Sequence, residues 1–155
     1  MITLLEALVD GADGSYASKQ DIRKLEHVIS SWAERKEAYL AIESKEKEIL
    51  DRAITAMEDS KFFQEEAMSE LGIDRCRRDM TLGLRAYSLA MLLQDEEMLK
   101  DRFIHWQKNI LQAMGLRQYQ GYKFLLEAVY AELPQAHADL LKPYIKIAQD
   151  AIAAI

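Results

Sequence analysis

Apolar residues recur at three- and four-residue spacing along most of the chain, which is the spacing of one face of an α-helix. Residues 2–10 show it first, with Leu4, Leu5 and Leu8 on one side. Two glycines in the segment Gly11–Gly14 can adopt positive φ, which suits a turn. The pattern therefore predicts a short helix followed by a turn.

Ser18 predicts the start of a second helix, because its side chain can cap the helix and Asp21 follows three positions later. The apolar spacing continues from Leu25 to Met57, with a break expected near Ser44. Further helices are predicted over residues 62–71, with an end at Gly72, and over residues 74–93, 95–114, 118–132 and 140–155, with Leu133–His137 as the last connection. In the 95–114 helix the inner side is expected to carry Phe103, Trp106, Ile110 and Leu111.

The expected fold class is all-α, since no segment shows a convincing alternation of apolar and polar residues. Seven or eight helices of mixed length with tight corners favour a globin-like arrangement over a regular four-helix bundle. We expect one domain over residues 1–155, with an N-terminal helical extension over residues 1–32 and a globin core in the remainder.

Composition supports one domain with a real core, because the 155 residues are 50% hydrophobic and 30% charged. The net charge of -6 and the sequence pI of about 5.1 argue against binding to nucleic acid or anionic membranes. No apolar run approaches the roughly 20 residues that span a bilayer, and no basic region opens a secretory signal. A cytoplasmic location is therefore expected, without membrane insertion.

The only cysteine stands in the sequence Cys76-Arg77-Arg78-Asp79. A single thiol cannot form an internal disulfide, so Cys76 is either a small core residue or a nucleophile. At about 100° per residue, Asp79 lies only about 60° from Cys76 on a helix. A thiol and a carboxylate are thus expected to line one groove, unless Cys76 simply packs in the core.

The same helix face is predicted to continue through Met80, Gly83, Tyr87 and Met91. A glycine inside a helix costs up to about 1 kcal/mol relative to alanine. Gly83 is easier to understand where another backbone or a flat ligand comes close.

Other kinds of chemistry find less support in the sequence. His27, His105 and His137 show no i, i+4 pairing, so no metal site is expected. There is no Ser-His-Asp order and no phosphate-binding glycine loop, so we expect no catalytic residues and no enzyme activity. A haem globin that uses His105 stays open as an alternative, against a partly exposed histidine on an amphipathic helix.

The motif Cys76-Arg77-Arg78-Asp79, followed by Leu84-Arg85, resembles the chromophore helix of the phycobiliprotein family. These proteins are the globin-fold light-harvesting subunits of cyanobacterial and red-algal phycobilisomes. Ala12-Asp13 and Tyr16 resemble the family's N-terminal hairpin, and the stretch from Tyr144 to Ile152 resembles its last helix. The resemblance thus implies a phycobilisome-type globin fold with an N-terminal helical hairpin.

Carried over to this chain, the resemblance implies that Cys76 forms a thioether to a linear tetrapyrrole, or bilin. Asp79 would accept hydrogen bonds from the pyrrole nitrogens, while Arg78, with Arg77 as a second candidate, would neutralise propionates. Gly83 and Tyr87 would line the same groove.

The resemblance also implies a dimer. Asp13 and Arg85 match positions that form an ion pair between two subunits of the family, and the aromatic Tyr16 follows Asp13 shortly after in the sequence. The expected partner is a second copy or a related globin subunit.

Three stretches depart from the antenna subunits of the family. The segment between Met57 and Cys76 is short, Leu82 and Gly83 stand where two aromatic residues are common, and Gln94–Glu97 replaces a glycine-containing turn. These departures favour a divergent paralogue, such as the bilin-biosynthesis-associated globins. Partners would then be bilin-biosynthesis or phycobilisome proteins, the latter bringing the chain to the thylakoid surface. A pigment-free interaction protein of the same family is the alternative.

Overall fold

A computed structural model describes residues 1–60, 70–113 and 121–153, and the regular structure of these ranges is entirely helical. This confirms the predicted all-α class. The elements are α1 (Ile2–Gly11), α2 (Lys19–Ser30), α3 (Trp32–Glu58), α5 (Glu70–Leu93), α6 (Glu96–Leu99), a π-helical turn η1 (Lys100–Ile104), α7 (His105–Ala113), α8 (Gly121–Glu132) and α9 (Gln135–Ala153).

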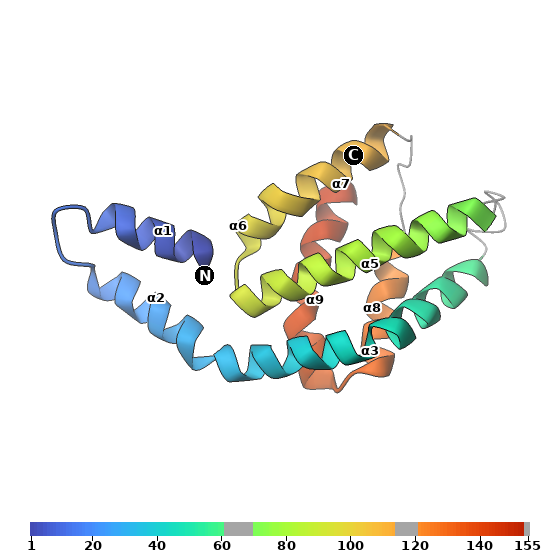
Figure 1. Cartoon of the computed structure of the whole chain (residues 1–155), viewed down its shortest axis with the longest axis horizontal. Helices are drawn as coiled ribbons and strands as arrows, with labels where there is room; N and C mark the ends of the chain where they lie inside the picture. Colours follow the sequence, from blue (N-terminus) through green and yellow to red (C-terminus); the bar gives the residue numbers. More distant parts are fainter. Residues whose placement is uncertain (61–69, 114–120, 154–155) are drawn as a thin grey trace.

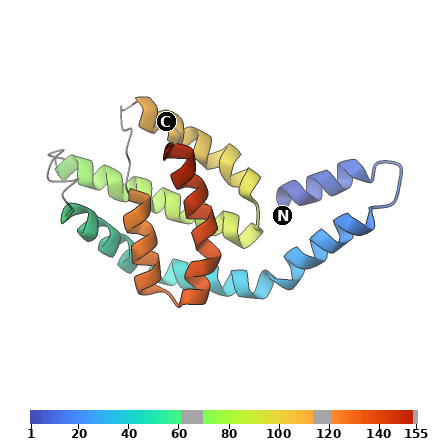
Figure 2. The ribbon, with the colours of Figure 1, turned by 180° about the vertical axis from the view of Figure 1, so that it is seen from behind.

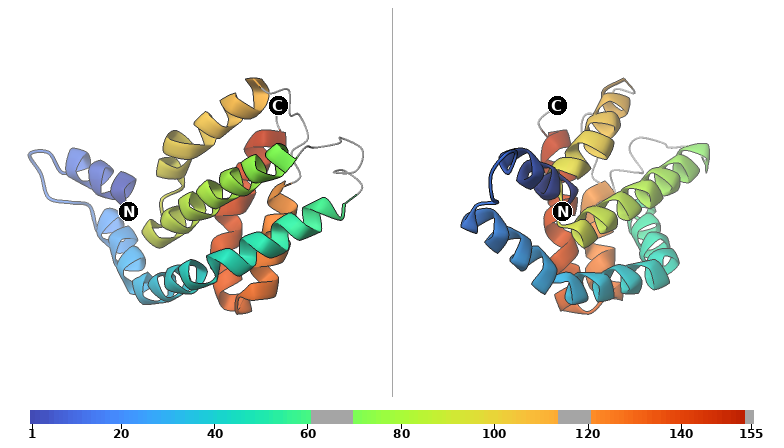
Figure 3. Two further views of the ribbon diagram at one scale, coloured as in Figure 1. Left: turned by 45° about the vertical axis from the view of Figure 1, so that its right-hand side comes forward. Right: turned by 60° about the vertical axis from the view of Figure 1, so that its left-hand side comes forward.

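The two longest helices, α3 and α5, pack against each other, and the antiparallel pair α8 and α9 crosses them on one side (Figures 1 and 2). The helix α6 contacts α5, and α7 continues from it on the same side of α5 (Figures 1 and 3). The hairpin of α1 and α2 extends away from this body, as the turned views also show (Figure 3). No residue of α1 is buried, so the hairpin contributes little to the core.

The face of α5 predicted from the sequence is indeed its buried face. Met80, Leu84, Tyr87 and Met91 are each at most 4% exposed and pack into one hydrophobic core. Cys76 lies partly buried at the edge of that core. The core therefore fixes which side of α5 carries the thiol.

The break predicted near Ser44 was wrong, because α3 runs without interruption from Trp32 to Glu58. The chain breaks instead at Ser31, whose hydroxyl donates to the His27 carbonyl oxygen at 3.1 Å. Ser44 makes a similar hydrogen bond to Ala41 within an intact helix. A serine whose hydroxyl donates to a carbonyl oxygen three or four residues earlier is found both at a helix end and within a helix. Apolar spacing alone therefore could not place the break.

Two other helix limits also differ from the prediction. Gly72 does not end a helix, since α5 begins at Glu70 and runs through it. Most of the helix predicted over residues 62–71 lies outside the described residues. The last helix begins at Gln135 rather than Leu140, because the Pro134 carbonyl oxygen accepts hydrogen bonds from the backbone of His137 and Ala138.

The π-helical turn η1 changes which residues of the next helix face inward. The buried positions step from Leu99 to Ile104, a spacing of five, and then continue to Gln107 and Leu111. Trp106 was predicted on the inner side, but its side chain is 48% exposed. The π-helical turn contains about one residue more than an α-helical turn, so the inward position falls on Gln107 instead of Trp106.

The end of α5 anchors the start of the hairpin. The carboxylate of Asp95, a residue only 3% exposed, accepts hydrogen bonds from the Thr3 backbone nitrogen at 2.8 Å and the Thr3 hydroxyl at 2.7 Å. The Met1 ammonium group donates to it at 3.2 Å and to the Leu93 carbonyl oxygen at 2.6 Å. These donors lower the pKa of Asp95 to about 2 against the effect of burial.

A buried arginine ties the other hairpin helix to the same place. Arg35 is 3% exposed and donates to the carbonyl oxygens of Val28 and Leu92. Its Nε also donates to the Ser31 hydroxyl at 3.2 Å. One guanidinium group therefore joins the end of α2, the start of α3 and the end of α5.

Within the described ranges, every helix is too short or too polar to cross a membrane.

Candidate functional site

The structure places Cys76 and Asp79 on the same side of α5, one turn apart and both partly buried. Burial raises the pKa of the Cys76 thiol, and the neighbouring Asp79 carboxylate raises it further. Burial also raises the pKa of Asp79, while Arg78 acts in the opposite direction. The thiol is thus mostly protonated at neutral pH and is a weak nucleophile on its own.

The two arginines of the motif have different surroundings. Arg77 donates to the Asp51 carboxylate of α3 at 2.7 Å, so its guanidinium group is held away from Asp79. Arg78 is exposed, and its charge lowers the pKa of Asp79 without a contact within 4 Å between the two charged groups. Of the two, Arg78 has the guanidinium group that is free to meet an anionic group of a ligand.

Gly83 has a reason within its own helix. A Cβ atom at this position would lie 3.1 Å from the Tyr87 hydroxyl oxygen and 3.2 Å from two carbons of its ring. The Tyr87 ring is buried and contacts Phe103 edge-on, with ring centroids 5.7 Å apart. The sequence favoured another backbone or a flat ligand beside Gly83, whereas in the structure the Tyr87 side chain makes the close approach.

Two small cavities border Asp79. One, of about 20 Å³, is lined by Asp79, Trp106, Gln107, Ile110 and Leu111. The other, of about 10 Å³, is lined by Asp79, Met80, Gly83, Tyr87, Gln107, Gly121, Tyr122 and Leu125. Each has room for about one water molecule. Neither of these two cavities has room for a large ligand.

The predicted interface residues are exposed but do not meet within one chain. Asp13 lies in the turn between α1 and α2, and the nearby Tyr16 is 100% exposed. Arg85 instead binds Glu46 of α3 through two hydrogen bonds, of 2.8 and 2.6 Å. Glu46 raises the pKa of Arg85, and Arg85 lowers the pKa of Glu46. Any contact between Asp13 and Arg85 would have to join two chains.

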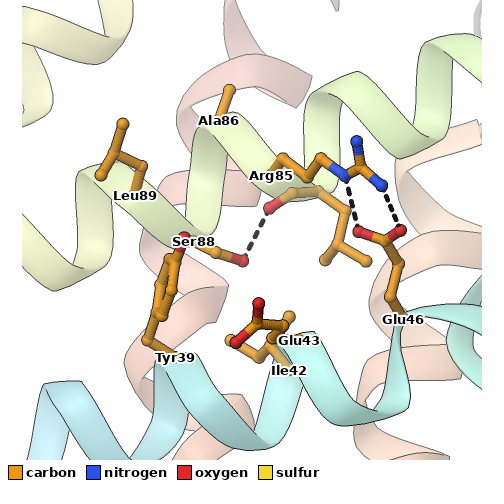
Figure 4. Close-up of a pocket in the computed structure, with 9 residues that line it drawn as sticks. Tyr39, Ile42, Glu43, Glu46, Arg85, Ala86, Ser88 and Leu89 are labelled. Carbon is orange, nitrogen blue, oxygen red and sulfur yellow. Dashed lines mark hydrogen bonds and ion pairs between the residues drawn. The ribbon is translucent and has the colours of Figure 1, made fainter.

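Arg85 borders a groove of about 490 Å³ between α3 and α5 (Figure 4). Its lining combines apolar and charged side chains, namely Tyr39, Ile42, Glu43, Glu46, Leu84, Arg85, Ala86, Ser88 and Leu89. The ion pair between Arg85 and Glu46 lies at one end, and the Glu43 carboxylate points into the middle (Figure 4). This hollow lies on a different side of α5 from Asp79.

His105, the residue considered as a haem ligand, lies on the surface. The His105 side chain is 66% exposed, and its Nδ1 lies 3.8 Å from an Asp101 carboxylate oxygen. Among the described residues no three His, Cys, Asp or Glu side chains lie close enough together to hold a metal ion.

Four residues beside the motif were missed by the sequence reasoning as site residues. Gln107 and Trp106 border Asp79 from α7, Tyr122 borders it from α8, and Asp51 holds Arg77. Gln107 carried a signal, because it is a polar residue three positions after Ile104 and four before Leu111 on an apolar stripe. Asp51 carried none, since 26 residues separate it from Arg77.

The helical body and the thiol and carboxylate on its central helix define an all-helical, globin-like protein with a candidate small-molecule site on α5. The sequence model of a family described as "Phycobilisome protein" matches residues 9–152. The chain therefore belongs to the phycobilisome protein family. A comparison with curated proteins found no match.

Proposed function

We propose that this phycobilisome-family protein holds or handles a bilin at Cys76 and Asp79, in light harvesting or in bilin biosynthesis. The observation that carries the proposal is the placement of a thiol and a carboxylate together on one side of α5, each partly buried. Family membership supports the class of ligand. Under this proposal the chain is a pigment protein rather than an enzyme.

The side chains at the site suit a bilin that lies on the outside of the α5–α7 contact. Asp79 borders two small cavities with a partly buried carboxylate, whose oxygens can accept hydrogen bonds from pyrrole N–H groups. Arg78 is available to a propionate. Binding pockets for small molecules measure roughly 300–1,000 Å³, so the cavities of about 10 and 20 Å³ cannot enclose a tetrapyrrole.

In covalent attachment the Cys76 thiol would be the only group of the protein that reacts. The Cys76 sulfur adds to one carbon of a C=C bond of the bilin, and the thiol proton goes to the neighbouring carbon. Nothing is oxidised and nothing leaves. Because burial and Asp79 raise the pKa of Cys76, the reactive thiolate is scarce at neutral pH. Attachment should therefore be slow unless the pH is raised or a separate protein assists.

Titration of the purified protein with biliverdin or phycocyanobilin tests the proposal. We expect a shift in bilin absorbance at pH 7.5, with a mass adduct that accumulates faster at pH 9. Cys76→Ala should abolish the adduct but keep the fold, because little volume is lost at a partly buried position. Asp79→Ala should change the absorbance while leaving the attachment point in place.

Asp74→Ala, at an exposed position near the start of α5, is a matched control and should behave like wild type. A wild-type protein that gives neither a spectral shift nor an adduct, under conditions where an antenna subunit responds, would contradict the proposal. The chain would then be the pigment-free interaction protein of the same family. A Soret band in the purified protein would instead favour haem.

We also propose that the chain pairs with a second copy or a related globin subunit through Asp13 and Arg85, with Tyr16 at the same contact. The exposure of all three side chains supports this. In this view residues 1–32 are an extension that serves assembly, and the remainder is the globin core. Association with a phycobilisome would bring the protein to the thylakoid surface, within the cytoplasm.

Asp13→Arg is expected to weaken self-association about three- to tenfold, as measured by sedimentation at micromolar concentration. The effect should be modest, because Arg85 is 63% exposed and Glu46 already neutralises it. Asp150→Arg makes the same change of charge at an exposed position of α9 and should leave association unchanged. A wild type that stays monomeric throughout this range would count against a homodimer.

A further inference from the structure

We propose that the Trp106 indole is the outer wall of the pigment site and stacks against the bilin. This inference rests on the proposed function, since it specifies how the same site holds its ligand. It starts from the exposure of Trp106, a large aromatic side chain that is 48% exposed beside a partly buried carboxylate.

Trp106 and Asp79 face each other from different helices. The cavity of about 20 Å³ is lined by Asp79 of α5 and by four residues of α7, including Trp106 and Ile110. The Trp106 ring also rests on Phe103, with ring centroids 5.9 Å apart and planes tilted by 46°. The indole is therefore supported from one side and open to solvent on part of its surface.

The floor beneath Asp79 is closed. Gln107 is 7% exposed, and its side-chain oxygen accepts a hydrogen bond from the Tyr87 hydroxyl at 3.4 Å. Tyr122 is 3% exposed and packs against the Tyr87 ring. A flat ligand that reaches Asp79 must therefore stay outside these side chains, at the level of Trp106.

Aromatic stacking suits a conjugated pyrrole system. A stacked aromatic pair changes affinity by about two- to tenfold beyond the area that it buries. Trp106 offers this contact next to the carboxylate that would bind the pyrrole nitrogens. It would hold the ring system in place, while Asp79 and Cys76 supply the polar and covalent contacts.

Biliverdin titration of Trp106 variants tests the inference through affinity. Trp106→Ala should weaken biliverdin binding about three- to tenfold, whereas Trp106→Phe should keep most of the affinity. Trp32→Ala is the control, because Trp32 is 38% exposed and lies at the start of α3, where it contacts Arg35. It should bind biliverdin like wild type, and circular dichroism should show that each variant is folded.

Hydroxyl-radical footprinting of the wild type gives a readout that needs no variant to fold. Oxidation of Trp106 should fall severalfold when biliverdin is added, while oxidation of Trp32 should not change. Absence of any biliverdin response in the wild type would contradict the proposed function itself. A normal response, with Trp106 unprotected and Trp106→Ala binding as tightly as wild type, would overturn the stacking role alone.

Discussion

Asp95→Ala is expected to lower the free energy of unfolding by about 2–4 kcal/mol at pH 7. The variant would leave the Thr3 backbone nitrogen and hydroxyl without their acceptor and would remove the counter-charge of the Met1 ammonium group. The backbone nitrogen of Met98, which donates to Asp95 at 3.1 Å, would lose its acceptor, so α6 would lose its N-cap as well. Both the hairpin and the start of α6 should loosen.

The pH dependence identifies the carboxylate as the cause. The pKa of Asp95 is about 2 in the folded protein and about 3.8 in an ordinary aspartate. Its contribution of about 2.5 kcal/mol is therefore complete above about pH 5 and is lost as the pH falls toward 2. Urea unfolding of wild type and Asp95→Asn should converge over this range.

Glu97→Gln serves as the control for Asp95, because Glu97 is 61% exposed on the same short helix. It should cost less than about 0.5 kcal/mol and should not change the convergence. A constant difference between wild type and Asp95→Asn from pH 7 to pH 2 would show that the charge of Asp95 does not stabilise the fold.

Arg35→Ala is expected to cost about 3–5 kcal/mol, the largest effect of any single substitution considered for this chain. The side chain is buried, and its loss would leave the Val28 and Leu92 carbonyl oxygens without these donors and open a cavity. Arg35→Lys should recover part of the stability, because a single ammonium group cannot reach every acceptor that the planar guanidinium reaches.

Urea unfolding measures the total cost at Arg35, and amide hydrogen exchange locates it. Protection should be lost first in α2, at the start of α3 and at the end of α5, before the α8–α9 pair exchanges. The adjacent Lys36→Ala, at an exposed position, should change neither measurement. Equal loss of protection across all helices would mean that Arg35 supports the whole core and not the hairpin junction.

The sequence correctly predicted features that depend on a short stretch of one helix, such as a helix start or its buried face. The helix start at Ser18 is confirmed, since the Asp21 backbone nitrogen donates to the Ser18 hydroxyl oxygen at 3.1 Å. The buried face of α5 is confirmed because apolar spacing reports burial directly. Limits such as Ser31 and Gln135 rest on local hydrogen bonds, to the His27 carbonyl oxygen and to the Pro134 carbonyl oxygen, which apolar spacing does not record.

At the candidate site, the sequence showed that Cys76 and Asp79 would share one side of a helix, but not what covers them. At Gly83 the sequence favoured a close approach by another backbone or a flat ligand, whereas the structure places the Tyr87 side chain there, one turn along the same helix. The partner of Arg77 is Asp51, and the partner of Arg85 is Glu46. Both pairs join α3 to α5, so they depend on how two helices align, which no local motif encodes.

The π-helical turn at Lys100–Ile104 acts as a one-residue insertion in the middle of a helix. A relative with one residue fewer here could keep an ordinary α-helix, and in an alignment without a gap in the turn its inward residues would stand opposite Phe103, Trp106 and Ile110. When this chain is aligned with others of its family, a gap placed outside the turn would pair Trp106 with residues that face the core. Comparisons at this site are therefore meaningful only when the gap falls between Leu99 and Ile104.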